Sequence, residues 1–345
     1  MSSDARSAPP WRGRPDGKPP TLKDVARLAG VSPITVSRTL NQPEIVRPAL
    51  RQKVFRAVRE SGYQPAMLTT GAAPQDSRLV AILVPTIVNS IFADTVQALM
   101  QTLTEAGHQT LLGLTDYSAE REERLLDALL RRRPDAMVLT GTLHTAASRL
   151  RLTQAGIPLV ECWDQGERPL DMLVGFSHMK VGEAIARALL ARGYRHFASL
   201  TLDDPRGRLR RDALRDELAR QGIAAPADVS LPPPATPALG RQGLARLLDA
   251  GVRPEVVVCS SDTLAHGVLA EAHARGLRVP EELAVMGFGN LASAAHLIPA
   301  LSTVDVRGAA MGAQAAEALL ARLAGAETQL RRDTGFELVM RESTR

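Results

Sequence analysis

Aromatic residues and cysteines are scarce in this chain of 345 residues. Aromatic side chains make up 3% of the chain and hydrophobic residues 45%, so a large core must be packed mainly from aliphatic side chains. The two cysteines, Cys162 and Cys259, each end an apolar run, and neither has a CxxC partner or a nearby set of histidines. This pattern argues against a zinc site and fits a reducing cytoplasm.

Long apolar runs are missing as well. No run approaches the roughly 18 residues that a membrane-spanning helix needs. Residues 1–19 are rich in Pro, Gly and Arg and lack the apolar middle of a secretion signal, so we expect a disordered basic tail there. Together these absences predict a cytoplasmic protein without a membrane partner.

Positive charge is concentrated at the N-terminus. Residues 1–65 hold 12 Lys and Arg against 5 Asp and Glu, whereas residues 66–345 hold 30 against 32. A basic first segment joined to a nearly balanced remainder is typical of a small domain that binds DNA phosphates.

The segment 21–41, TLKDVARLAGVSPITVSRTLN, predicts two short helices around a tight turn. Thr21 and Asp24 are spaced as a capping box, and Gly30 suits the left-handed end of the first helix. Ser32 can cap the second helix, with Pro33 at its first position. Such a unit presents the start of its second helix to the DNA major groove. The expected DNA-facing residues here are Thr21, Ser32, Pro33, Ile34, Thr35, Ser37, Arg38 and Asn41.

Arg38 is the expected base reader, because its guanidinium can contact a guanine edge with two hydrogen bonds. Ile34 can only contact a thymine methyl group or fill space. The alternative is a helical hairpin inside a larger core, but a core hairpin would not keep this polar outer face. A third helix is expected over 48–61, with Arg47 where a cap would stand and Tyr63 closing the domain; we expect both to take part in the DNA-binding surface.

Residues 21–41 closely resemble the headpiece of the LacI/GalR-type repressor family, whose pattern TLxDVAxxAGVSxxTVSRxLN is matched at nearly every fixed position, so we expect a DNA-binding domain over 20–65. The resemblance implies an operator-binding homodimer that reads bases through Pro33, Ile34 and Arg38. It also implies a hinge helix over 66–77 with a side chain wedged into the minor groove. An ungapped match puts Ala72, a poor wedge, at the wedge position. Either Leu68 supplies the wedge in a shifted register, or this protein bends DNA less; both alternatives stay open.

From residue 78 to 341, apolar runs alternate with amphipathic stretches. The expected strands are 79–85, 110–114, 136–139, 158–162, 172–176, 196–200, 256–260 and 283–288. Strands that alternate with helices predict parallel sheets covered by helices on both faces. Some 260 residues are too many for one such sheet, so we expect an α/β core of two doubly wound lobes. This resembles the periplasmic-binding-protein-like fold of the LacI family, which binds an effector and dimerises.

Ligands of open α/β sheets bind beyond the carboxyl ends of the strands. The loops that follow the expected strands therefore hold the candidate effector-binding residues. Some of them, such as Ser90 and Asp262, can equally cap the helix that follows. The candidates are Asn89, Ser90, Phe92, Asp116, Trp163, Asp164, Ser177, Arg208, Arg210, Ser261, Asp262 and Asn290.

One departure from the family pattern bears on the effector. The family usually has GxDD, whose aspartate binds sugar hydroxyls, where this chain has Gly289 and Asn290. The loss of a carboxylate, together with Arg208 and Arg210, favours a carboxylated ligand, because Arg binds carboxylates with two hydrogen bonds. The segments VECWD and DMLVGFSH also resemble the gluconate-operon repressor group. We therefore expect gluconate or another sugar acid, with a different sugar or a phosphorylated sugar as the alternative.

Other classes of protein are less consistent with the sequence. It contains no nucleophile elbow, no GxxxxGK loop, no HExxH and no GxGxxG after a strand, so we expect no enzyme, no cofactor and no metal. A solute-binding protein without a regulatory role is the second alternative, and the N-terminal helix-turn-helix argues against it. We expect a homodimeric, nucleoid-associated regulator.

Overall fold

The structure is a computed structural model that describes residues 20–41, 46–61, 63, 77–87, 90–326 and 331–344. The chain divides into two compact units, 1–75 and 76–345, and the division falls in the segment predicted as a linker. The tail at 1–19 and the wedge candidates Leu68 and Ala72 lie outside the described residues.

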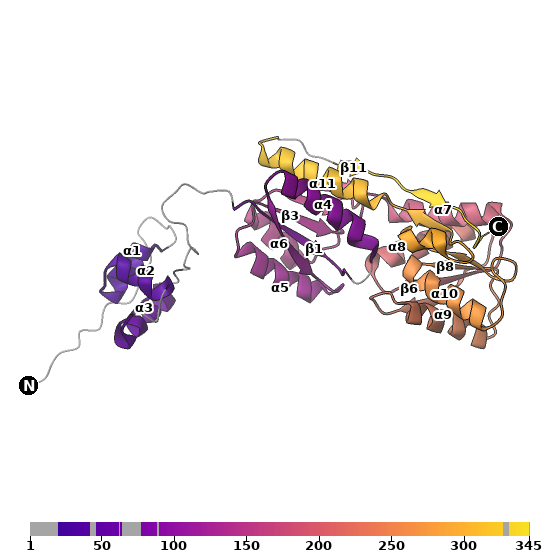
Figure 1. Ribbon diagram of the computed structural model, residues 1–345, viewed down its shortest axis with the longest axis horizontal. Helices are drawn as coiled ribbons and strands as arrows, with labels where there is room; N and C mark the ends of the chain where they lie inside the picture. Colours follow the sequence, from indigo (N-terminus) through magenta and orange to yellow (C-terminus); the bar gives the residue numbers. More distant parts are fainter. Residues whose placement is uncertain are drawn as a thin grey trace, which may run out of the picture. The chain divides into compact units, whose positions relative to one another are not determined.

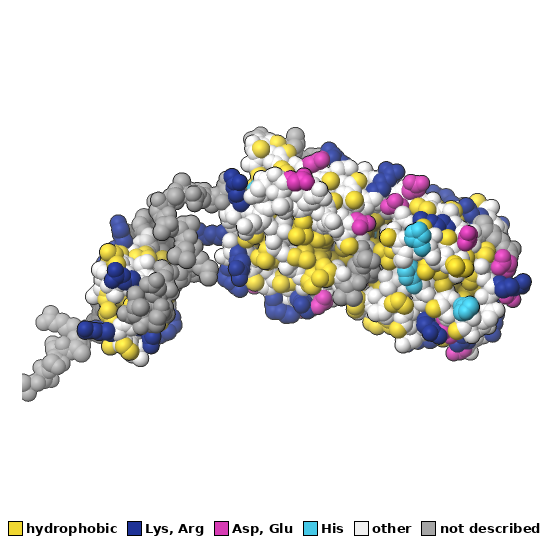
Figure 2. Space-filling view, viewed as in Figure 1, with side chains coloured by type: hydrophobic (Ala, Val, Ile, Leu, Met, Phe, Trp, Pro, Cys, Tyr) yellow, Lys and Arg dark blue, Asp and Glu magenta, His cyan; other side chains and the backbone are white. Residues whose placement is uncertain are grey.

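The first unit is built from three helices, α1 (Leu22–Ala29), α2 (Pro33–Asn41) and α3 (Pro48–Ser61) (Figure 1). Asp24 accepts hydrogen bonds from the Thr21 amide (2.9 Å) and hydroxyl (2.6 Å), which fixes the start of α1. Gly30 ends this helix with φ = 65°, as the sequence predicted. Val25, Val36 and Val54, one from each helix, are fully buried between them. On the face drawn in Figure 2, Lys and Arg side chains lie around the surface of this unit.

The second unit begins with a six-stranded parallel sheet in the order β11-β5-β4-β3-β1-β2. Alternate residues of its strands enter two separate cores, as Ile82 and Leu83 of β1 show. Helices α4 and α11 cover one face and α5 and α6 the other (Figure 1). Its elements are β1 (Leu79–Val84), η2 (Ser90–Phe92), α4 (Ala93–Glu105), β2 (Gln109–Leu114), α5 (Ala119–Leu130), β3 (Ala136–Thr140), α6 (Ala146–Ala155), β4 (Leu159–Cys162), β5 (Met172–Gly175), α11 (Gly308–Leu323) and β11 (Arg331–Asp333).

A second lobe surrounds a four-stranded parallel sheet in the order β7-β6-β8-β9. Helices α7 and α8 pack together on one face and α9 and α10 on the other (Figure 1). The elements are α7 (His178–Ala191), β6 (Phe197–Leu202), α8 (Pro205–Arg220), β7 (Ala227–Leu231), α9 (Pro237–Asp249), β8 (Val256–Cys259), α10 (Asp262–Ala274), β9 (Ala284–Met286) and η3 (Ala292–His296).

Three crossings connect the lobes. The chain leaves the first sheet after β5, returns after β10 (Thr303–Asp305) to form α11 and β11, and goes back to pair β12 (Glu337–Val339) antiparallel with β10. All eight predicted strands are present, and the predicted two-lobed α/β class is confirmed. Four strands were not predicted: β7, β10, β11 and β12. Three of them have only three residues, and β7 is a partly exposed edge strand with polar side chains.

Within the described residues, no helix combines the length and apolar character needed to cross a membrane.

Candidate functional site

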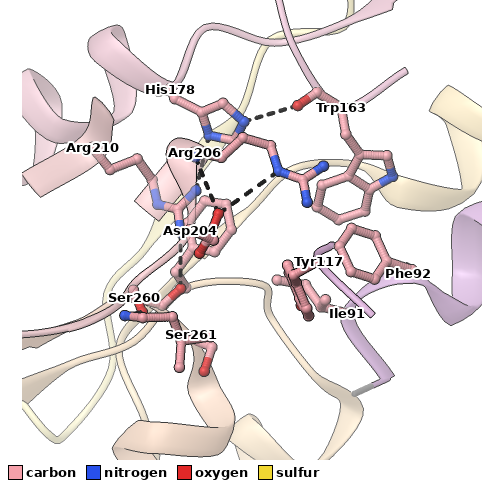
Figure 3. Close-up of a pocket in the computed structure, with 12 residues that line it drawn as sticks. Ile91, Phe92, Tyr117, Trp163, His178, Asp204, Arg206, Arg210, Ser260 and Ser261 are labelled. Atoms are coloured by element: carbon pink, nitrogen blue, oxygen red, sulfur yellow. Dashed lines mark hydrogen bonds and ion pairs between the residues drawn. The ribbon is translucent and has the colours of Figure 1, made fainter. Parts of the chain in front are cut away.

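A partly open cavity lies where strands of both sheets end, with about 360 Å³ of empty space when the adjoining solvent is included. We call it the cleft cavity. Its walls come from the segments that follow β1, β2, β4 and β5 of the first sheet and β6, β8 and β9 of the second, as expected for an α/β binding site. The lining residues are Ile91, Phe92, Tyr117, Trp163, His178, Leu202, Asp204, Arg206, Arg210, Ser260, Ser261 and Phe288 (Figure 3).

One wall of the cavity is aromatic. The rings of Phe92 and Trp163 meet edge to face with centroids 4.7 Å apart. The Trp163 indole donates a hydrogen bond to the Thr95 hydroxyl (3.2 Å), which fixes its plane. Trp163 has φ = 67°, in the left-handed region that a bulky side chain rarely adopts. Strain of this kind is held where the surrounding structure requires it, often at ligand sites.

Helix α8 supplies the charged wall. Asp204 caps the helix by accepting hydrogen bonds from the amides of Arg206 and Gly207, both at 3.1 Å. The Arg206 guanidinium lies 5.5 Å from the Phe92 ring centre, and its Nε is 3.9 Å from Asp204 Oδ1. Figure 3 shows Arg206 extended toward the aromatic wall and Arg210 beside Ser260. The Nη1 atom of Arg206 is buried and has no hydrogen-bond partner within the described part of the chain.

Arg210 is held from three directions. Its Nη2 donates to the Ser260 carbonyl (3.0 Å), its Nη1 lies 2.9 Å from His178 Nδ1, and its guanidinium stacks on the Phe288 ring at 3.9 Å. Burial lowers the pKa of Arg210 to about 10, so the group remains a cation at neutral pH. The charges that line the cavity are therefore two guanidinium groups and the Asp204 carboxylate.

Tyr117 faces the cavity from the loop after β2. Burial raises the pKa of its hydroxyl to about 12, so the phenol stays protonated and can donate a hydrogen bond. The hydroxyls of Ser260 and Ser261 already accept hydrogen bonds from the amides of Leu202 (2.9 Å) and Leu264 (3.2 Å), and each can still donate its own proton to a ligand. The cavity thus combines two cations, several hydroxyl groups and an aromatic face.

The conformation of Gly289 disfavours any side chain at this position, where the sequence departs from the GxDD pattern. Gly289 has φ = 121°, a conformation that is practically restricted to glycine. A Cβ atom at this position would lie 3.0 Å from the Ile91 side chain. An aspartate at this position would therefore need a different local backbone.

Four of the predicted effector residues line the cavity: Phe92, Trp163, Arg210 and Ser261. Of the expected pair, Arg210 lines the cavity together with Arg206, and Arg208 does not. Residues four apart share one face of a helix, whereas Arg208, two positions from each, points to solvent and pairs with Asp203. This periodicity is the signal that would have identified Arg206 from the sequence.

The other predicted effector residues have partners elsewhere. Asp116 is exposed and pairs with Arg121, Asp164 accepts from the Thr142 hydroxyl (2.7 Å), and Ser177 caps α7. These three lie outside the cavity lining.

The side chains of Asp262 and Asn290 likewise form hydrogen bonds within the protein. The buried Asp262 accepts from the Thr303 hydroxyl (2.6 Å) and the Leu291 amide (2.8 Å), and Asn290 accepts from Arg341 (2.8 Å). Asn89 lies outside the described residues, as does the side chain of Ser90. Eight further residues line the cavity that were not among the predicted site residues, although Tyr117, His178 and Phe288 lie in loops that were predicted to hold the effector. The eight are Ile91, Tyr117, His178, Leu202, Asp204, Arg206, Ser260 and Phe288.

On the helix-turn-helix, Pro33, Ile34 and Arg38 are exposed on α2, and Ile34 is 65% exposed. Ser32 accepts from the Thr35 amide (3.2 Å) as the predicted cap. Ser37 is half-buried, Arg47 and Thr21 are exposed, and Asn41 ends the helix. Tyr63 packs against the three-helix core, so its ring is at least partly structural. DNA contact by all these residues stays a prediction.

The three-helix unit and the two-lobed cleft define a DNA-binding regulator with a ligand-sensing core. Residues 21–66 match the bacterial regulatory proteins of the lacI family, and residues 186–344 match a periplasmic binding protein-like domain. The HTH-type transcriptional regulator GntR of Pseudomonas aeruginosa is 39% identical over 94% of this chain and 96% of its own length. The regulator of the same name in Escherichia coli K12 is 32% identical over 93% and 97%. The chain belongs to the LacI family of transcriptional regulators.

Solved structures agree with this assignment. A LacI family regulator from Silicibacter pomeroyi is 31% identical with a TM-score of 0.76, covering 95% of this chain and all of its own. The transcription regulator GntR from Chromobacterium violaceum is 34% identical with a TM-score of 0.73, over 77% of this chain and 99% of its own. LacI-family members bind operator DNA and small effectors, so the prediction of a regulator rather than an enzyme is confirmed.

Proposed function

We propose that this LacI-family repressor is controlled by a carboxylated small molecule, gluconate or a related sugar acid, bound in the cleft cavity. The observation that carries the proposal is the buried Nη1 of Arg206, which has no partner among the described residues. A buried donor without a partner costs about 1–3 kcal/mol, and a ligand carboxylate would remove that cost.

Three features support an acid over a neutral sugar. Arg206 and Arg210 outnumber the single carboxylate of the lining, Asp204. Gly289 stands where the family has an aspartate that binds sugar hydroxyls. The hydroxyls of Tyr117, Ser260 and Ser261 suit the polyol chain of a sugar acid. The resemblance to gluconate-operon repressors, together with the names of the relatives above, favours gluconate among these acids.

On DNA, we propose a cytoplasmic homodimer whose two headpieces bind operator half-sites related by a dyad. Arg38 would read a guanine and Ile34 a thymine methyl group. An effector that contacts both lobes stabilises one arrangement of the core, and operator affinity then changes by the coupling free energy. We propose that the effector releases DNA, in line with the resemblance to sugar-acid repressors.

A pair of ligands that differ only in the carboxylate tests the effector class. D-gluconate and D-glucitol share the polyol chain, and glucitol has a hydroxymethyl group in place of the carboxylate. Calorimetric titration of the full chain should show binding of gluconate and at least 30-fold weaker binding of glucitol, a difference of about 2 kcal/mol for a charge-assisted pair. Equal affinity would refute the proposal, and a preference for 6-phosphogluconate would indicate a phosphorylated effector.

A further inference from the structure

His178 links the charged wall of the cleft cavity to its aromatic wall. It is the first residue of α7, is 2% exposed, and uses both ring nitrogens (Figure 3). Its Nδ1 is 2.9 Å from Arg210 Nη1, and its Nε2 is 2.8 Å from the Trp163 carbonyl oxygen. Trp163 follows β4 of the first sheet, whereas Arg210 belongs to α8 of the second lobe. The His178 imidazole therefore connects one residue of the first lobe with one residue of the second.

These contacts define the protonation state of the ring. A guanidinium can only donate, so Nδ1 must accept and carries no proton. A carbonyl oxygen can only accept, so Nε2 carries the proton and donates it to Trp163. The imidazole is therefore neutral. Burial, followed by the charges of Arg210 and Arg206, holds the pKa of His178 well below its usual value, which agrees with this state.

The neutral state matters for Arg210. Among the described residues, the groups that hold its guanidinium by a hydrogen bond or by stacking are uncharged: the His178 imidazole, the Ser260 carbonyl and the Phe288 ring. The Asp204 carboxylate acts on Arg210 through its charge, without a hydrogen bond to it. An arginine held by a carboxylate has its charge largely compensated, whereas one held by neutral acceptors keeps its attraction for an anion.

We propose that His178 is a positioning residue that determines effector specificity, because it fixes Arg210 and Trp163 with a neutral side chain and so keeps the cleft cavity selective for anions. This rests on the proposed function, since it takes the effector to be an acid. Arg210 contacts the effector carboxylate together with Arg206, and His178 acts through Arg210.

Two His178 variants with side chains of nearly equal size distinguish an effect of charge from an effect of shape. His178→Asn keeps a neutral acceptor near the Nδ1 position, whereas His178→Asp adds a carboxylate there. We expect His178→Asp to bind gluconate about 10- to 100-fold more weakly than His178→Asn, with glucitol affinity changed equally little in both. Equal gluconate affinity of the two variants would overturn the proposal. Circular dichroism and thermal unfolding of each variant check that the core around His178 is folded.

A second measurement needs neither effector nor a stable Asp variant. Nitrogen-15 NMR of the full chain labelled at histidine, with the His178 signals assigned by their loss in His178→Asn, reports the tautomer directly. We expect Nδ1 without a proton and Nε2 with one at pH 7. An imidazolium, or the opposite tautomer, overturns the proposal. If the wild-type chain binds no sugar acid, the proposed function fails, and the tautomer still decides whether His178 fixes Arg210.

Discussion

Arg206 and Arg210 lie one turn apart on α8, and both line the cleft cavity, while Arg208 between them faces solvent and pairs with Asp203. Three arginines within five residues thus have two different environments. The difference follows from helical periodicity alone, because positions i and i+4 share a face and position i+2 does not. Arg208→Ala is therefore a matched control for substitutions of the two cavity arginines.

Replacing either cavity arginine should weaken effector binding without unfolding the headpiece. We expect Arg206→Ala and Arg210→Ala each to weaken gluconate binding by about 2–3 kcal/mol, since each loses a charge-assisted hydrogen bond. Arg208→Ala removes the same charge from the same helix and should leave gluconate affinity within about 0.5 kcal/mol of wild type. Calorimetry on the three variants measures the differences. Equal losses in all three would show that only the net charge of the lobe matters.

Trp163 should report effector binding by its fluorescence. Its indole lines the cavity and is the edge partner of Phe92, so a bound ligand changes its surroundings directly. The only other tryptophan is Trp11, and a Trp11→Phe background leaves Trp163 as the single emitter. We expect gluconate to change the emission of this variant in a saturable way, with the dissociation constant found by calorimetry. An unchanged spectrum at saturating gluconate would place the ligand elsewhere.

The sequence predicted the fold more completely than the site. Strands such as β1 and β8 are buried on both faces, so they appear in the sequence as continuous apolar runs. Site residues are harder to recognise in the sequence, because a polar side chain after a strand can either face the ligand or form hydrogen bonds within the protein. Asp262 illustrates the second case, since its carboxylate accepts hydrogen bonds from the Thr303 hydroxyl and the Leu291 amide. His178 was missed because its role depends on Trp163 after β4 and on Arg210 of α8, which lie 15 and 32 residues away in the sequence. Asp204 was missed although its partners, the amides of Arg206 and Gly207, are its near neighbours in the sequence.

DNA recognition should depend on Arg38. The side chain is exposed on α2, beside Pro33 and Ile34, on the face expected to enter the major groove. We expect Arg38→Ala to weaken binding to an operator selected from random duplexes by about 1–3 kcal/mol and to relax specificity at one base pair. Gel-shift titration measures both effects, with Arg208→Ala as the control for lost charge. An unaltered operator affinity would mean that another side chain reads the base.

Because of His144, the free energy of unfolding of the core should fall as the pH rises into the alkaline range. Its Nδ1 faces Glu122 (2.9 Å) and its Nε2 faces the Gly141 carbonyl (3.1 Å) and Glu161 (3.4 Å), so both nitrogens meet acceptors. Burial disfavours the cation, but the two carboxylates outweigh it and raise the pKa of His144 to about 9.

Because the folded pKa exceeds the unfolded one of about 6.5, His144 stabilises the fold fully below pH 6.5 and loses that contribution as the pH rises to 9. The loss amounts to roughly 3 kcal/mol. Thermal unfolding between pH 6 and 9.5 should show the decline in wild type and a flatter profile in His144→Gln. Parallel profiles would exclude a charged His144.

The most direct test of ligand control over DNA binding is a fluorescence-anisotropy titration of gluconate into the complex of the full chain with its operator. We expect operator affinity to fall by about 5- to 150-fold at saturating gluconate, the range of a 1–3 kcal/mol coupling. Arg210→Ala should abolish this change, and Arg208→Ala should retain it. An operator affinity that stays the same or rises in the presence of gluconate would contradict this expectation.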